Sequence, residues 1–132
     1  MNELADAIYD KLYANAGLLA AVGTRIYRGL AAQNATYPLV TFIKVGGGTL
    51  SETPVEASDT LYLVSAVSDV SPAQAETLAG YIHAALHMAT LTVSGWTNIW
   101  TAVETHLEVV ELPGDGIPLW QAGRFIRFRL SK

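Results

Sequence analysis

The chain has 132 residues, a length typical of one domain, and 51% of them are hydrophobic while only 15% are charged. The absence of cysteine excludes disulfides and thiolate chemistry. The formal net charge of −4 argues against a free-standing DNA-binding protein, which needs a basic surface to displace counterions.

Hydrophobic periodicity and turn residues divide the chain into helices and strands. Apolar residues at helical spacing predict helices, and β-branched runs between glycines and prolines predict strands. In chain order the expected elements are a helix over 3–16, a helical turn over 18–22, strands over 25–28, 39–45 and 59–68, a helix over 72–88, and strands over 91–93, 98–112 and 118–130. This order predicts an α+β fold: a single domain over 1–132, with a mainly antiparallel (mixed) β-sheet packed against two principal helices.

Residues with strong positional preferences mark several boundaries. Asn15 and Gly17 indicate that the first helix ends there. Pro38 lacks a backbone donor and therefore belongs at the start of its strand. Ser71, with Gln74 three residues later, forms the pattern of a capping box at the start of the second long helix.

The segment 46–58, GGGTLSETPVEAS, has few large apolar side chains between two predicted strands. Its three glycines and Pro54 predict a flexible loop or a bent β-arm that becomes ordered against a neighbouring subunit. The glycines are not followed by the Gly-Lys-Ser/Thr sequence of a phosphate-binding loop, so a phosphate site is not expected.

The last two strands are expected to form a hairpin around the PGDG turn at 113–116. A register that aligns the apolar faces of both strands would place Glu104 near Arg127. The resulting ion pair would help to fix that register. Phe125 and Arg129 would share the face of Arg127, because side chains alternate along a strand.

Three histidines are the only candidates for metal chemistry. His83 and His87 are spaced to lie on one helix face and could share a metal ion with His106. The residue after His83 is not glutamate, so the zinc-protease pattern is absent. We therefore expect no catalytic residue, no cofactor and no bound metal, and keep a small metal-dependent enzyme using these histidines as an alternative.

The low content of charge predicts a subunit of an assembly. Soluble domains have roughly 25% charged residues, and interface cores are depleted in charge and enriched in aromatic residues. Six tyrosines and three tryptophans fit such a surface. A compact monomer with a polar, uncharged surface is the alternative.

The stretch ANAGLLAAVGTRIYRGLAAQNATYPLVTF resembles the tail-terminator, or tail-completion, proteins of long-tailed phages, including the minor tail protein U type. In that family a helix and a Leu-x-x-x-Val-Gly-x-Arg-Ile-Tyr turn lead to a loop with a glutamine, and a proline then opens a strand. The matching residues are Leu18, Val22, Gly23, Arg25, Ile26, Tyr27, Gln33 and Pro38.

The resemblance implies a structural virion protein rather than an enzyme. Proteins of this family form a ring, typically of six subunits, on the head-proximal end of the tail tube, where the ring stops tube growth. The implied partners are other copies of the chain, the tail tube protein and head–tail connector proteins. Neither a membrane nor a specific nucleic-acid sequence is implied, although DNA could pass through the ring lumen. The implied location is the virion tail, with assembly in the host cytoplasm.

Two further expectations follow from the resemblance. Neck and tail-tube proteins share the same general fold, so a neck or head-completion protein is the second candidate. The ring interface is expected to include the exposed sheet edges, the segment 46–58, and the hairpin face formed by Glu104, Phe125, Arg127 and Arg129.

Overall fold

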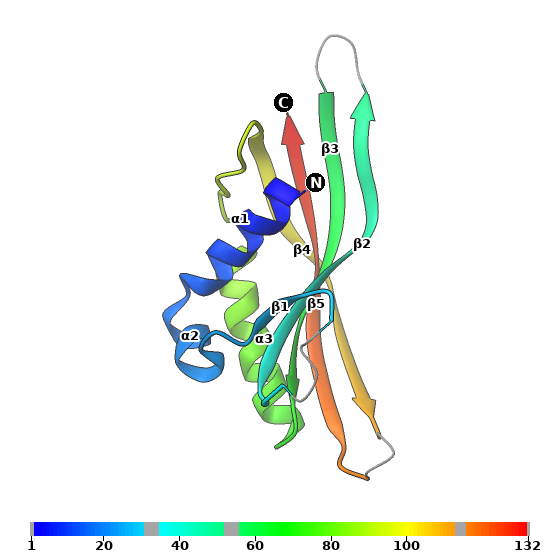
Figure 1. The fold of residues 1–132 in the computed structure, drawn as a ribbon. Coiled ribbons are helices and arrows are strands. Elements are labelled where there is room, and N and C mark those ends of the chain that lie inside the picture. Colours follow the sequence, from blue (N-terminus) through cyan, green and yellow to red (C-terminus); the bar gives the residue numbers. More distant parts are fainter. Residues whose placement is uncertain (1, 31–34, 52–55, 113–115, 132) are drawn as a thin grey trace.

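The computed structural model describes residues 2–30, 35–51, 56–112 and 116–131. These residues form three helices and one five-stranded sheet (Figure 1). The elements are α1 (Asn2–Tyr13), α2 (Ala16–Val22), β1 (Ile26–Arg28), β2 (Leu39–Ser51), β3 (Glu56–Ser68), α3 (Pro72–Leu86), β4 (Thr97–Glu111) and β5 (Leu119–Ser131).

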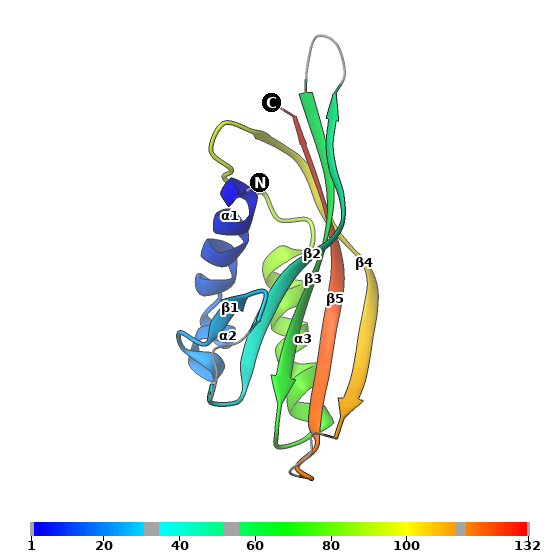
Figure 2. The same cartoon turned by 45° about the vertical axis from the view of Figure 1, so that its right-hand side comes forward.

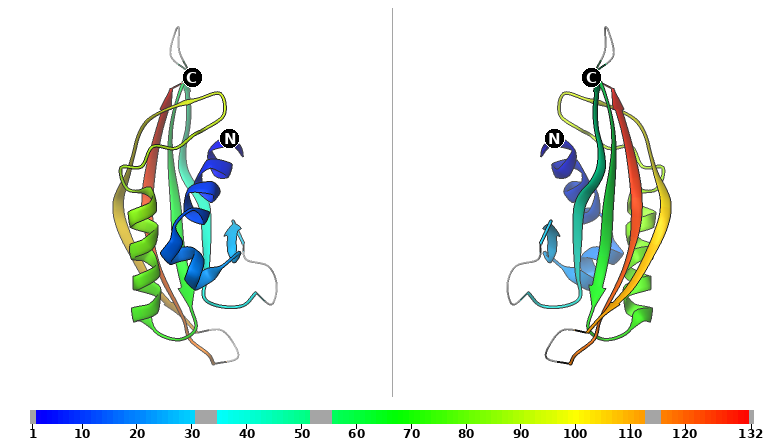
Figure 3. Two further views of the ribbon diagram at one scale, coloured as in Figure 1. Left: turned by 90° about the vertical axis from the view of Figure 1, so that its left-hand side faces the viewer. Right: turned by 90° about the vertical axis from the view of Figure 1, so that its right-hand side faces the viewer.

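The strands lie in the order β1-β2-β3-β5-β4. The short β1 runs parallel to β2, and every other neighbouring pair is antiparallel. The helices cover one face of this sheet. In Figure 3 they lie in front of the sheet in the left view and behind it in the right view. The predicted α+β class with a mixed, mainly antiparallel sheet is therefore confirmed.

The core lies between the sheet and the helices. Phe42, Tyr62 and Phe128 come from three adjacent strands and point to the same side, with the ring of Phe128 edge-on to Tyr62 at 5.7 Å between centroids. Apolar residues of α1 and α3, such as Ile8 and Ile82, are fully buried against these strands. Helical spacing in the sequence predicted these two helix faces.

The first helix ends earlier than expected, so the predicted span 3–16 is wrong. The Asn15 side chain accepts a hydrogen bond from the backbone N–H of Leu18 at 2.9 Å and caps the start of α2. Asparagine occurs both at helix starts and at helix ends, so its position alone does not distinguish the two. The capping hydrogen bond to Leu18 shows that Asn15 begins α2.

The start of α3 follows the predicted cap only in part. Ser71 accepts a hydrogen bond from the backbone N–H of Gln74 at 3.1 Å, as expected. The Gln74 side chain, however, accepts from the hydroxyl of Ser68 instead of returning to the Ser71 backbone. Ser68 in turn accepts from the Ser71 N–H at 3.4 Å, so it replaces the second half of the capping box.

The described parts of 46–58 are paired strands rather than a loop. Residues 46–51 pair with 56–61 in register as continuations of β2 and β3, whereas 52–55, including Pro54, lie outside the described residues. The register shifts at Val45, and Gly47 follows with φ of +78°. A Cβ at Gly47 would stand 2.0 Å from the carbonyl oxygen of Asp59, so only glycine fits this close approach. Figure 2 shows β2 and β3 continuing together toward the upper end of the sheet.

Of two predictions about the C-terminal half, one is wrong and the other holds for the ion pair but not along the whole register. The expected strand over 91–93 is reduced to a single bridge between Val93 and Trp96. In the hairpin, Arg127 pairs with Ala102, two residues before Glu104 on β4, although its side chain reaches Glu104 and forms the expected ion pair. The register of β4 shifts at Glu104. Such a bulge adds one residue and moves everything beyond it to the opposite face.

The bulge divides the apolar residues of β4 between two environments. Val103 pairs with the buried Ile126 on the helix side, as expected. Beyond the bulge, Leu107 pairs with Gly123 and Val109 with Gln121, on the face that no helix covers. The apolar faces of the two hairpin strands therefore coincide only on one side of the bulge, and not along the whole hairpin as expected.

Candidate assembly surface

The sheet face opposite the helices is here called the open face. Its side chains alternate with the core residues along each strand, so it takes Leu61 and Leu63 from β3 and Phe125 and Arg127 from β5. These four are half-buried, because neighbouring side chains on the same face cover them in part. The open face thus combines apolar side chains with placed charges.

Arg127 joins three strands across the open face. Its Nη1 donates to Asp59 Oδ1 on β3 at 2.7 Å, and its Nη2 donates to Glu104 Oε2 on β4 at 3.3 Å. Its Nε also donates to Glu104. The hydrogen bonds that Arg127 donates to Glu104 and to Asp59 raise its pKa, so Arg127 stays charged. We call Asp59, Glu104 and Arg127 the charge triad.

The structure gathers the four predicted interface residues on the open face. Glu104 and Arg127 form the expected ion pair, although through the bulge. Phe125 lies between Leu63 and Thr105 in the two neighbouring strands. Arg129 is exposed and has no ion pair among the described side chains. Their role in an interface stays a prediction.

The third member of the triad was not foreseen. Asp59 belongs to a strand that is distant in sequence, and β3–β5 pairing brings it opposite Arg129 and beside Arg127. Local pattern predicts a hairpin between consecutive strands but carries no signal for this non-local pairing.

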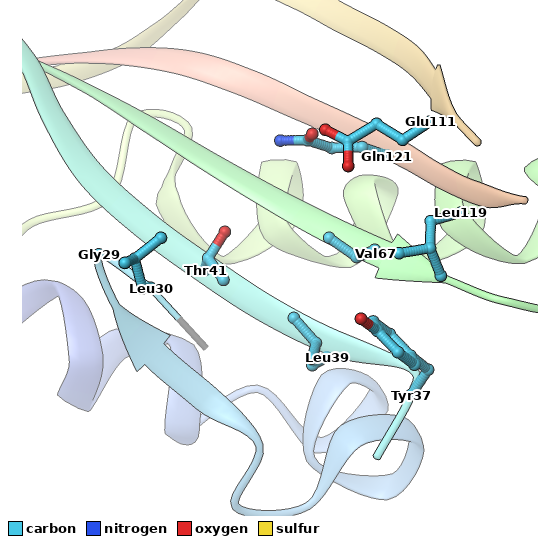
Figure 4. Close-up of a pocket in the computed structure, with 9 residues that line it drawn as sticks. All are labelled: Gly29, Leu30, Tyr37, Leu39, Thr41, Val67, Glu111, Leu119 and Gln121. Carbon is cyan, nitrogen blue, oxygen red and sulfur yellow. The ribbon is translucent and has the colours of Figure 1, made fainter. Parts of the chain in front are cut away.

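A pocket of about 370 Å³ opens on the lower part of the same face (Figure 4). Thr41 and Gln121 make its floor polar. Both contact the buried Ser65 hydroxyl beneath the lining, which lies 3.3 Å from Thr41 Oγ1 and accepts from Gln121 Nε2 at 2.8 Å. Glu111 and Tyr37 line its sides. This lining has one carboxylate and no histidine, serine or cysteine, so it offers no nucleophile–base pair. No pattern in the sequence predicted this pocket.

The three histidines that the sequence marked do come together, between α3 and β4. The ring of His83 lies 4.8 Å from that of His87 and 5.9 Å from that of His106, between centroids. Nδ1 of His87 already accepts a hydrogen bond from the backbone N–H of Val103 at 3.0 Å. Within the described residues, no group of three or more His, Cys, Asp or Glu side chains is placed to hold a metal ion. We call these residues the histidine cluster.

Burial and neighbouring positive charge act on the histidine cluster together. Desolvation lowers the pKa of His83, and the nearby His87, Arg124 and His106 lower it further. Arg124 is itself buried and paired with Glu76 at 2.7 Å. His83 therefore favours the neutral imidazole.

The described helices include none that is long and apolar enough to cross a membrane. The arrangement as a whole is an open sheet face with placed charges. Comparison with known proteins gives this surface a context. A family model described as Tail completion protein gp17 matches residues 6–110. The chain belongs to that family.

Membership in the tail completion protein family confirms the resemblance inferred from Leu18 to Pro38. The chain is also similar to one in a solved structure described as "Virion of native gene transfer agent (GTA) particle". The TM-score is 0.82 at 20% sequence identity, covering 98% of this chain and 95% of that chain. At this identity the likeness establishes the shared fold. No curated protein matches the sequence at a significant level.

Proposed function

We propose that this tail completion protein is a tail terminator. Copies of the chain form a ring, hexameric as in the proteins it resembles, on the head-proximal end of the tail tube. The ring stops tube polymerisation and offers the surface to which head–tail connector proteins bind. The observation that carries this proposal is the family match over residues 6–110.

The proposal places the chain in the virion tail, after assembly in the host cytoplasm. Its relative in the gene transfer agent virion shares the fold over nearly the whole length of both chains, which supports a place in such a particle. DNA would pass through the ring lumen without being read, in keeping with the net charge of −4.

The surface of the chain supports an assembly role. The open face offers half-buried apolar side chains around the charge triad, and polar groups within apolar surroundings give an interface its specificity. We propose that Glu104, Phe125, Arg127 and Arg129 contribute to contacts with neighbouring copies or with the tube. The triad keeps the Arg127 charge at a fixed place on that face.

A terminator acts by competition at the tube end. A tube grows through head-to-tail contacts that do not close, so growth continues until something else occupies the end. The terminator must therefore bind the last tube ring better than the next tube subunit does. This task needs shape and charge complementarity and no catalytic residue.

Deletion of the gene from a virus or particle system that carries it tests the proposal. We expect tail tubes of uncontrolled, excessive length that do not join heads, visible by negative-stain electron microscopy. Supplying the wild-type chain from a plasmid should restore normal tails. Tails of normal length, with the defect confined to DNA leaking from heads, would contradict the proposal and indicate a neck or head-completion protein.

A further inference from the structure

The two edges of the sheet carry opposite charge. The edge strand β4 contains Glu104, Glu108 and Glu111 and no lysine or arginine. At the other edge, β1 and β2 contain Arg28 and Lys44 and no acidic residue. We call these the acidic edge and the basic edge. We propose that they are the two halves of one contact, in which the acidic edge of one copy lies against the basic edge of the next. This inference rests on the proposed ring.

Exposed apolar side chains accompany the charges at both edges. Among the described strands, every exposed large hydrophobic residue lies in β2 or β4. Val110 on β4 is 57% exposed and Ile43 on β2 is 49% exposed. The other such residues are Val45, Ile99 and Val109. Exposed apolar groups beside complementary charges are what a protein–protein contact buries.

The charges at the two edges stand at matching heights along the strands. One row of paired residues runs from Arg28 through Phe42, Val64 and Arg124 to His106. The row that begins at Lys44 ends at Val103, next to Glu104. Glu108 lies two residues beyond His106, about 7 Å along the strand. Two copies placed side by side would thus bring Arg28 near Glu108, within reach of long side chains, because both lie on rows of helix-side residues. Lys44 adds positive charge to the same edge, on the face opposite to Glu104.

A single copy cannot pair these charges with each other. Neighbouring strands are about 4.8 Å apart, so β1 and β4 are separated by about 19 Å across the sheet. Lys44, Glu108 and Glu111 have no ion pair among the described residues, and Arg28 bonds only the amide oxygen of Asn2, at 3.0 Å. A neighbouring copy would supply the missing partners.

The backbone of both edges is suited to a limited contact. Because β1 pairs only with residues 40–42 of β2, the part of β2 beyond Phe42 is a free edge. Register shifts at Val45 on β2 and at Glu104 on β4 interrupt both edges. Such bulges prevent long backbone pairing between copies, so side chains decide which edges meet. A contact between two different edges is heterologous, and it produces a ring when the rotation closes.

Charge reversal of each edge tests the contact. One variant, Arg28→Glu with Lys44→Glu, has two acidic edges, and the other, Glu108→Lys with Glu111→Lys, has two basic edges. Glu104 is left unchanged because it holds Arg127. Self-association is measured by sedimentation velocity over a concentration series at low salt, with native mass spectrometry to count subunits.

We expect each variant alone to associate at least about tenfold more weakly than the wild type, because like charges face each other. An equimolar mixture should recover association, since each variant keeps the edge that the other needs, and its rings should alternate the two chains. The control Asp10→Lys with Asp69→Lys changes net charge equally away from both edges and should associate like the wild type. Circular dichroism verifies that every variant is folded.

Two results would overturn the inference. Folded variants that each form rings as the wild type does would show that the edges do not meet, while leaving the proposed ring intact. Variants that lose association and do not recover it on mixing would show that the two edges are not each other's partners. A wild-type chain that stays monomeric across the whole series would contradict the proposed ring and this contact together.

Discussion

Removing the positive charge of Arg127 is the most direct perturbation of the charge triad. The side chains of Arg127 and Asp59 are 28% and 26% exposed, so solvent screens their ion pair only in part. A largely exposed ion pair contributes about 0.2–1 kcal/mol, and bidentate arginine geometry places a pair toward the upper end. We therefore expect Arg127→Gln to lower the free energy of unfolding by about 1–2 kcal/mol for the two pairs together.

A double-mutant cycle separates the ion pair from other effects of the substitution. The four proteins are wild type, Asp59→Asn, Arg127→Gln and the double variant, each unfolded in urea at a concentration where the chain is monomeric. Tryptophan fluorescence reports unfolding, since the chain has three tryptophans. We expect a coupling energy of about 0.5–1 kcal/mol between Asp59 and Arg127, decreasing in about 1 M salt, where the Debye length falls to about 3 Å.

A coupling energy indistinguishable from zero at low salt would refute the geometry of the triad. A coupling that is unchanged in high salt would mean that packing, and not charge, links the two residues. A further variant, Arg127→Glu, should weaken self-association at higher protein concentration, because the open face loses the positive charge that Arg127 places there. The chain should remain folded, because partly exposed ion pairs contribute little to stability.

Three other predictions concern the fold and the histidine cluster. The pKa of His83 is lowered in the folded chain, below its usual value of 6.5. The stability that His83 contributes is therefore present above pH 6.5 and is lost as the pH falls below it. Between about pH 7 and about pH 5, the melting temperature should decrease less steeply for His83→Gln than for the wild type. Gly47→Ala should destabilise the chain by about 1–3 kcal/mol in urea unfolding, whereas Gly46→Ala, where an added Cβ meets nothing within 4 Å, serves as the control with a smaller effect. Elemental analysis of dialysed protein should find no stoichiometric metal, and one zinc per chain would favour the enzyme alternative.

Local signals in the sequence predicted the elements that depend on neighbouring residues. The apolar stripe of α3 and the capping bond of Ser71 follow from spacing and from side-chain chemistry within a few positions. The ion pair between Glu104 and Arg127 joins consecutive strands, so the hairpin pattern was sufficient to find it. The family resemblance carried the functional assignment, which no side-chain chemistry in the chain could have supplied.

The features that escaped prediction depend on contacts between distant segments. Asp59 enters the charge triad only because β3 lies beside β5, and no local pattern specifies that neighbour. The bulge at Glu104 moves every side chain beyond it to the other face of the sheet. The sequence carries no sign of the bulge, because the alternation of residue types continues through it. In the sequence, Gly47 suggested a flexible segment. In the structure, the carbonyl of Asp59 lies so close that only glycine fits between the paired strands.

A cryo-EM map of the intact particle tests the central claim most directly. The account predicts a closed ring of copies of this chain at the head-proximal end of the tail tube, with β4 of each copy against the edge formed by β1 and β2 of the next. Density for the chain within the head-side connector, or its absence from the junction between tube and connector, would contradict the terminator assignment.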